Sequence, residues 1–130
     1  GFNKTRQNAS HVHSINLDPQ NTFAVIADLG TDKLTMLSFN LKSGQLKVLK
    51  DQSAQTAPGA GPRHLTFSAN GKYVYVANEL NNTVEAFSID SAYGSLHHFP
   101  TIRTIPDDYK GSNYPADIHL SPNGRFLYVS

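Results

Sequence analysis

The chain has no cysteine among its 130 residues. This absence excludes a disulfide framework, and it also excludes a zinc site built on thiolate ligands. A chain without cysteine is compatible with a cytoplasmic protein, and we predict that location. The length allows one domain with a real hydrophobic core, but it is too short for two.

The sequence also lacks an excess of charge of either sign, because 11 basic residues face 10 acidic ones and the basic residues are scattered. Nucleic-acid-binding domains carry a clustered basic surface, which this chain does not have, so we predict no nucleic-acid partner. No apolar run approaches the roughly 20 residues that a membrane-spanning helix needs, and we predict no membrane partner. No segment shows a convincing helical period.

What the sequence does contain is an internal repeat. The segments 14–29, 64–80 and 117–130 each read as a short alternating strand, a polar turn and a second strand rich in aromatic and apolar residues. Leu17, Phe67 and Leu120 correspond, at offsets of 50 and 53 residues. Repeats of 20 to 50 residues are typical of solenoids and propellers, and they decide the fold before any local feature does.

The turns explain why the repeat folds as antiparallel strands. The tetrapeptides DPQN, SANG and SPNG supply proline, asparagine and glycine where a hairpin needs a fixed or positive φ. A third strand with period-two alternation follows at 33–40 and 83–90, and a weaker fourth strand follows it. Four antiparallel strands in about 50 residues describe one blade of a β-propeller.

The sequence therefore predicts an all-β chain made of about two and a half four-stranded blades. We place the blades at about 12–50, 63–103 and 116–130, the last one incomplete, with loops at 51–62 and 104–115 between them. An open arc of blades leaves apolar faces and strand edges uncovered. We therefore expect the chain to be part of a longer propeller, and to contact the remaining blades or to associate with copies of itself.

The repeats diverge at one end of the first strand of each blade, the strand that lines a propeller's central channel. Positions that only pack should carry similar residues in every repeat, whereas these carry different polar ones. Glu79, after the second strand, likewise corresponds to Leu29 in the preceding blade. Convergent ionisable groups at a channel mouth are the default active-site hypothesis. The predicted cluster consists of His11, His13, Arg63, His64, Glu79 and Asp117.

These residue types fit a small acidic substrate. Hydrolysis at a carbonyl group would need a base that activates water and donors for the developing oxyanion. Arg63 suits either the second task or the anchoring of a phosphate or carboxylate, because its planar fork binds two oxygens at once. In the alternative interpretation Arg63 pairs with Glu79 and only fastens neighbouring strands. The His11-x-His13 spacing has no third ligand, so we predict no metal and no cofactor.

Four segments resemble the lactonase family of seven-bladed propellers. They are HVHSINLDP, ADLGTDKL, GAGPRHLTFSANGKYVYVANELNNTVEAFSID and YPADIHLSPNGRFLYVS. The resemblance covers about residues 11–130, and GPRH followed by NEL sixteen residues later, and then by ADIHLSP, is its specific part. It implies a ring of seven blades, of which this chain would form a middle portion.

The resemblance also implies an activity, the opening of 6-phospho-D-glucono-1,5-lactone to 6-phosphogluconate in the pentose phosphate pathway. Similarity to a fungal muconate cyclase of the same fold implies a catalytic set of Arg63, Glu79 and His13 or His11, with a further arginine beyond Ser130. His11, His64 and Asp117 are then expected to bind the substrate, a small anionic sugar lactone. A carboxylate substrate and a non-catalytic propeller scaffold remain as alternatives.

Overall fold

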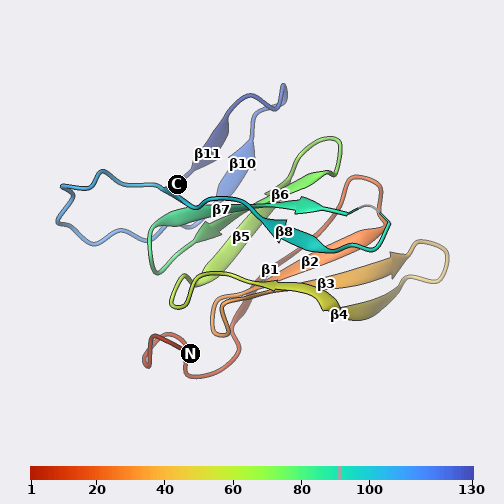
Figure 1. Cartoon of the computed structure of the whole chain (residues 1–130), viewed down its shortest axis with the longest axis horizontal. Helices are drawn as coiled ribbons and strands as arrows, with labels where there is room; N and C mark the ends of the chain where they lie inside the picture. The colour runs from red at the N-terminus through yellow and green to blue at the C-terminus, as the bar shows by residue number, and fades with distance from the viewer. Residues whose placement is uncertain (91) are drawn as a thin grey trace.

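The computed structural model describes residues 1–90 and 92–130. These residues form eleven strands and no helix, and every strand pairs antiparallel with its neighbour (Figure 1). The prediction of an all-β chain of antiparallel sheets is thereby confirmed. Within the described residues there is no helix long and apolar enough to cross a membrane.

The strands form two large sheets and one hairpin, in chain order. The first sheet contains β1 (Val12–Leu17), β2 (Phe23–Asp28), β3 (Lys33–Asn40) and β4 (Gln45–Gln55). The second contains β5 (Pro62–Phe67), β6 (Tyr73–Asn78), β7 (Thr83–Ile89) and β8 (Leu96–His98), and β9 (Ile102–Arg103) also pairs with β7. The hairpin consists of β10 (Ile118–Leu120) and β11 (Leu127–Val129).

The first hairpin turn of each repeat has the same backbone geometry. Its fourth residue takes a positive φ in all three repeats: 54° at Asn21, 68° at Gly71 and 68° at Gly124. Glycine and asparagine tolerate this left-handed conformation better than other residues do. The turn residues of the sequence thus set where each first strand ends and each second strand begins.

The fourth strands differ from the prediction. β4 extends to Gln55, so the loop before the second sheet comprises residues 56–61 instead of 51–62. The extension stays paired because the ladder shifts register between Leu34 and Met36. There the Ser53 hydroxyl accepts a 3.1 Å hydrogen bond from the Met36 amide. In the second sheet the corresponding strand is divided into β8 and β9 around Pro100, which has no N–H to donate to a ladder.

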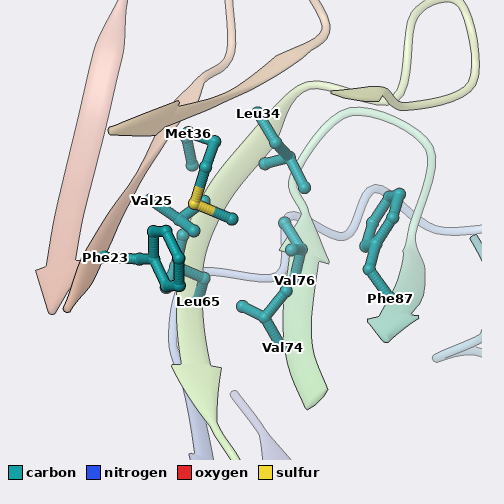
Figure 2. Close-up of a cluster of buried hydrophobic side chains, with 9 residues drawn as sticks. Phe23, Val25, Leu34, Met36, Leu65, Val74, Val76 and Phe87 are labelled. Carbon is teal, nitrogen blue, oxygen red and sulfur yellow. The ribbon is translucent and has the colours of Figure 1, made fainter. Parts of the chain in front are cut away.

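The main hydrophobic core lies between the two large sheets, as Figure 2 shows. It consists of Phe23, Val25, Ala27, Leu34 and Met36 from the first sheet, and of Leu65, Val74, Val76 and Phe87 from the second. A smaller cluster joins Ala77 and Val84 of the second sheet to Ile118 of the hairpin. Each sheet therefore packs face to face on the next, as neighbouring propeller blades do.

The first strand of each unit lies beside the first strand of the next: β1 next to β5, and β5 next to β10. Polar side chains join the first two, since the Ser14 hydroxyl donates to the Arg63 carbonyl over 2.8 Å. The Asn16 amide likewise donates to the Leu65 carbonyl over 3.1 Å. This arrangement brings the polar starts of the three strands to one end of the molecule.

The first sheet leaves the apolar side chains of its other face exposed. Ile15, Leu17, Leu46 and Val48 each expose 43–52% of their surface, and Ile15, Leu17 and Leu46 line a shallow cavity of about 260 Å³. On the hairpin at the other end, Phe126 and Tyr128 are likewise exposed. Both ends of the blade series therefore present apolar surface of the kind that the middle buries.

Candidate active site

The strands β1 and β5 both begin with a β-bulge. The ladder between β1 and β2 shifts register between Val12 and Ser14, and the ladder between β5 and β6 shifts between Pro62 and Leu65. A bulge inserts an extra residue and re-aims the side chains around it. The bulges lie at His13 and at Arg63 with His64, so the local fold gives these side chains directions that a regular strand would not.

Glu79 follows the last residue of β6 and is held against the start of β5. Its backbone amide donates to the Gly61 carbonyl over 2.9 Å, and the residue is 6% exposed. A carboxylate this buried needs compensating partners. Arg63 supplies one through a 2.8 Å contact from Nε to Glu79 Oε2. The predicted pair thus forms, which agrees equally with a catalytic and with a strand-fastening role.

The second partner of Glu79 is Arg6, whose Nη2 donates to Oε1. The sequence interpretation missed Arg6, because residues 1–11 precede the repeat and have no counterpart in the other blades. Only the composition of this segment, with Lys4 and Arg6 two residues apart, indicated any charge there. One carboxylate therefore neutralises two guanidinium groups in part, which leaves the group of three with a net positive charge.

His13 lies at the surface beside these charges. Partial desolvation by its surroundings, followed by the positive charge of Arg63, lowers the pKa of His13 below its ordinary value of 6.5, against a smaller opposite effect of Glu79. At neutral pH the imidazole is therefore uncharged and able to accept a proton. A neutral imidazole next to cationic donors is the combination that base-assisted ester hydrolysis requires.

His64 and Asp117 continue the network from Arg63. Arg63 Nη1 lies 3.1 Å from His64 Nε2 and donates to the Ala116 carbonyl over 3.0 Å. Because a guanidinium can only donate, His64 Nε2 accepts, and the Nδ1–H donates to Asp117 over 2.9 Å. Hydrogen bonds from His64 and then from His119 hold the pKa of Asp117 well below its usual range.

His119 donates from Nε2 to Asp117 over 2.8 Å at an exposed position. His11 lies apart from the ion pairs. Its backbone amide donates to Asp28 over 2.7 Å, and its Nε2 lies 3.0 Å from Asn8 Oδ1. The side-chain network therefore runs from Arg6 through Glu79, Arg63 and His64 to Asp117, and His11 and His13 lie near its Arg6 end.

A small cavity lies at each end of this network. The cavity of about 220 Å³ at the Arg6 end is lined by Thr5, Arg6, Asn8, His11, His13 and Leu29. The cavity of about 170 Å³ at the other end includes Ser14, Asn16, His64, Asp117 and His119 in its lining. All six residues predicted for the site line one of these cavities or join the two; their individual roles stay predictions. Within residues 1–90 and 92–130, no three histidine, aspartate or glutamate side chains are grouped as metal ligands.

The sequence profile of one protein family, described as "Lactonase, 7-bladed beta-propeller", matches residues 1–130. The chain belongs to this lactonase family. The resemblance found in the sequence is confirmed, and so is the prediction that the chain is a fragment of a β-propeller. The first two sheets are accordingly called the first and second blades below.

Relatives in the lactonase family include enzymes named 6-phosphogluconolactonase. That of Serratia proteamaculans (strain 568) is 41% identical over 118 residues, which are 91% of this chain and 35% of the relative. That of Pectobacterium carotovorum subsp. carotovorum (strain PC1) is 36% identical over 118 residues, with the same coverage. The chain therefore spans about a third of the length of the curated relatives it matches.

Solved structures give the same fold. A protein from Lactobacillus plantarum superposes with a TM-score of 0.87 at 37% identity, over 95% of this chain and 35% of that chain. The periplasmic gluconolactonase of Pseudomonas aeruginosa superposes with a TM-score of 0.85 at 34% identity, over 95% of this chain and 34% of that chain.

Proposed function

We propose that the protein to which this chain belongs is a lactone hydrolase that opens 6-phospho-D-glucono-1,5-lactone to 6-phosphogluconate. The observation that carries the proposal is the buried carboxylate of Glu79 held between Arg6 and Arg63, with a neutral His13 beside them. This arrangement places a net positive charge and a base at the starts of β1 and β5. The names of the relatives point to the same substrate.

The first step in this proposal is the attack of water on the lactone carbonyl. His13 accepts one proton of the water as its oxygen bonds to the carbonyl carbon, and the carbonyl oxygen becomes an oxyanion. Arg63 donates hydrogen bonds to that oxyanion. Its Nε and Nη1 are held by Glu79 and Ala116, so Nη2 is the donor left to face the substrate. Donors fixed in advance stabilise developing charge without reorganising during the reaction.

The second step is the collapse of this intermediate. The carbonyl re-forms, the bond from the carbonyl carbon to the ring oxygen breaks, and the proton held on His13 passes to the departing oxygen. The product is a hydroxy acid, which loses a proton to the solvent to become the carboxylate. Glu79 takes no proton in this scheme; it orients Arg63 and offsets part of its charge.

A carboxylate-bearing lactone is the second candidate substrate, because arginine binds carboxylate and phosphate with the same fork. Compartment and substrate are linked: a phosphorylated lactone is charged and does not cross a membrane unaided, so its hydrolase has to share its compartment. We propose the cytoplasm for this reason. A neutral gluconolactone as substrate would favour a periplasmic location, which is that of the Pseudomonas aeruginosa neighbour.

We further propose that the exposed apolar faces of the first blade and of the hairpin contact further blades of the same protein. Ile15, Leu17, Phe126 and Tyr128 would then be buried as the equivalent faces are between the first two blades. Residues 1–130 expressed alone should associate with copies of themselves through these faces. A monodisperse monomer in sedimentation velocity, unfolding cooperatively, would contradict this.

The activity is tested with the whole protein and a panel of three lactones: the phosphorylated one, glucono-1,5-lactone and a carboxylate-bearing one. Acid release at constant pH is measured against spontaneous hydrolysis. We expect the highest kcat/KM for the phosphorylated lactone. The highest kcat/KM for the carboxylate-bearing lactone would favour the second candidate substrate. Hydrolysis no faster than the spontaneous rate for all three lactones would favour a non-catalytic propeller scaffold.

A further inference from the structure

The N-terminal turn, residues 3–8, carries Arg6 to the channel end of the first two blades. Together with the start of β1 it encloses the cavity of about 220 Å³, called here the N-terminal hollow and lined by Thr5, Arg6, Asn8, His11, His13 and Leu29. Nothing in the repeat pattern accounts for this segment, and the scheme above gives Arg6 no task beyond its contact with Glu79.

We propose that the N-terminal hollow is the subsite for the phosphate group of the lactone, and that Arg6 is the residue that selects a phosphorylated over a neutral substrate. This inference rests on the proposed hydrolase function and gives Arg6 and Arg63 different roles. Arg6 holds the phosphate, and Arg63 remains available for the lactone carbonyl on the other side of Glu79.

The size of the hollow fits one end of a ligand. Sites that enclose a whole small molecule usually measure about 300–1,000 Å³, and the hollow is smaller. Arg6 is 44% exposed in its side chain, whereas Arg63 is 25% exposed. The more accessible guanidinium thus lines the hollow, where a terminal group of the substrate can reach it.

The chemistry of the lining fits an anion with several oxygens. Five of the six lining residues are polar, and none of them is a carboxylate. Arginine binds phosphate oxygens through two parallel N–H groups. Asn8 Oδ1 is engaged by His11 Nε2 at 3.0 Å, which leaves the Asn8 amide nitrogen to donate to a ligand, as the Thr5 hydroxyl can.

The turn that carries Arg6 is fixed before any ligand binds. Asn3 Oδ1 accepts from the Arg6 amide over 3.0 Å, and the Gln7 amide donates to the Asn3 carbonyl over 2.8 Å. Gln7 is 1% exposed, and its Nε2 donates to the Leu29 carbonyl over 2.8 Å and to Asp32 Oδ1 over 2.6 Å. A binding group on a fixed backbone loses less freedom when the ligand binds.

The test compares Arg6→Gln with Lys4→Gln in the whole protein. Lys4 lies two residues away, is exposed, and joins no ion pair within the described residues, so its replacement removes the same charge without touching the hollow. The readout is the ratio of kcat/KM for the phosphorylated lactone to kcat/KM for glucono-1,5-lactone. We expect Arg6→Gln to lower this ratio on the order of 10- to 100-fold, as the loss of a charged hydrogen bond does. Lys4→Gln should leave it unchanged.

An equal loss for both lactones would overturn the inference, because Arg6 would then act only by positioning Glu79. A second measurement keeps this separate from the proposed function. Inorganic phosphate is titrated calorimetrically into the wild-type protein and into Arg6→Gln. Weaker phosphate binding to the variant supports the subsite even if the wild-type protein does not hydrolyse the phosphorylated lactone. Equal phosphate binding to both proteins refutes the subsite even if the wild-type protein hydrolyses that lactone.

Discussion

The first strands of the three repeats, β1, β5 and β10, are alike at one end and differ at the other. At the turn end, the three repeats agree in backbone geometry, with hydrogen bonds of 2.9, 2.9 and 2.8 Å from the fourth turn residue back to the first. At the channel end, corresponding positions carry His13, Arg63 and Ala116. Positions that only have to fold are free to repeat, whereas positions that act on a ligand at one place in the ring have to differ. We therefore expect divergence between the blades of one propeller to indicate where its site lies.

The largest effect should come from substitutions at the channel end, at Arg63 and Glu79. Arg63→Lys keeps the charge but removes the planar fork, and Glu79→Gln removes the charge that orients it. Losing an oxyanion donor of this kind typically lowers the rate about a hundredfold or more, which corresponds to about 3 kcal/mol. We expect each variant of the whole protein to lose turnover on this scale in steady-state assays, with a melting temperature close to that of the wild type.

The contrary result has a clear meaning. If Arg63→Lys lowers the melting temperature strongly while the folded fraction keeps its specific activity, then the Arg63–Glu79 pair only fastens the strands. The 2.8 Å contact between them is compatible with either role, so the two measurements have to be made on the same preparation.

The second-largest effect should come from a substitution at the turn end. There we expect stability to fall and activity to stay unchanged. Gly124 has a φ of 68°, and a Cβ added there would meet no atom within 4 Å. Gly124→Ala therefore introduces only backbone strain, which costs about 1–2 kcal/mol for an L-residue in the left-handed region. We expect a lower melting temperature of the whole protein and an unchanged kcat/KM. An unchanged melting temperature would show that the turn relaxes.

A smaller effect concerns the pKa of His13, which partial desolvation and the charge of Arg63 lower below 6.5. The sign follows from the charge: removing a cation makes protonation easier. We expect the pKa of His13 to rise in Arg63→Gln and to stay constant in Arg103→Gln, whose arginine lies on β9 and pairs with Asp107. NMR titration of the imidazole protons measures both.

The same pKa shift predicts the acid limb of the activity and a trend in stability. If His13 is the base, kcat/KM should persist just below pH 6.5 and be lost as the pH falls through the lowered pKa. Between that pKa and 6.5 the unfolded chain binds more protons at this residue, so its contribution to folding stability rises with pH and is lost on acidification. An acid limb centred above 6.5 would exclude His13 as the base.

The smallest effect should come from making the three turns more alike. Asn21 has the φ of 54° that its counterparts Gly71 and Gly124 adopt as glycines. Asn21→Gly relieves strain in the folded state but gives the unfolded chain more freedom, and these terms nearly cancel. We expect a change in stability of ~0.5 kcal/mol or less, visible only in denaturant titrations. A loss well beyond this would reveal a role for the Asn21 side chain.

The sequence made the fold predictable because turn chemistry and strand alternation recur three times. It failed at β4, where Asp51–Gln55 are polar except for Ala54 and carry no clear alternation. There the pairing with β3 depends on a register shift in which β4 has extra residues, Ser53 among them. The polar cluster was predictable from the divergence of the repeats. Arg6 was not, because residues outside a repeat have nothing to diverge from, and its contact with Glu79 exists only in three dimensions.

The ion pair between Arg6 and Glu79 joins residues 73 positions apart, with the whole first blade between them. Such a contact cannot form until the intervening chain has folded and the second blade has docked, because closing a long loop has to precede the contacts that reward it. We therefore expect the site to be among the last features to form during folding. A chain stalled with one blade complete would have most of its local strand pairs and no electrostatic site, so that recovery of activity after refolding would report the docking of blades and not their formation.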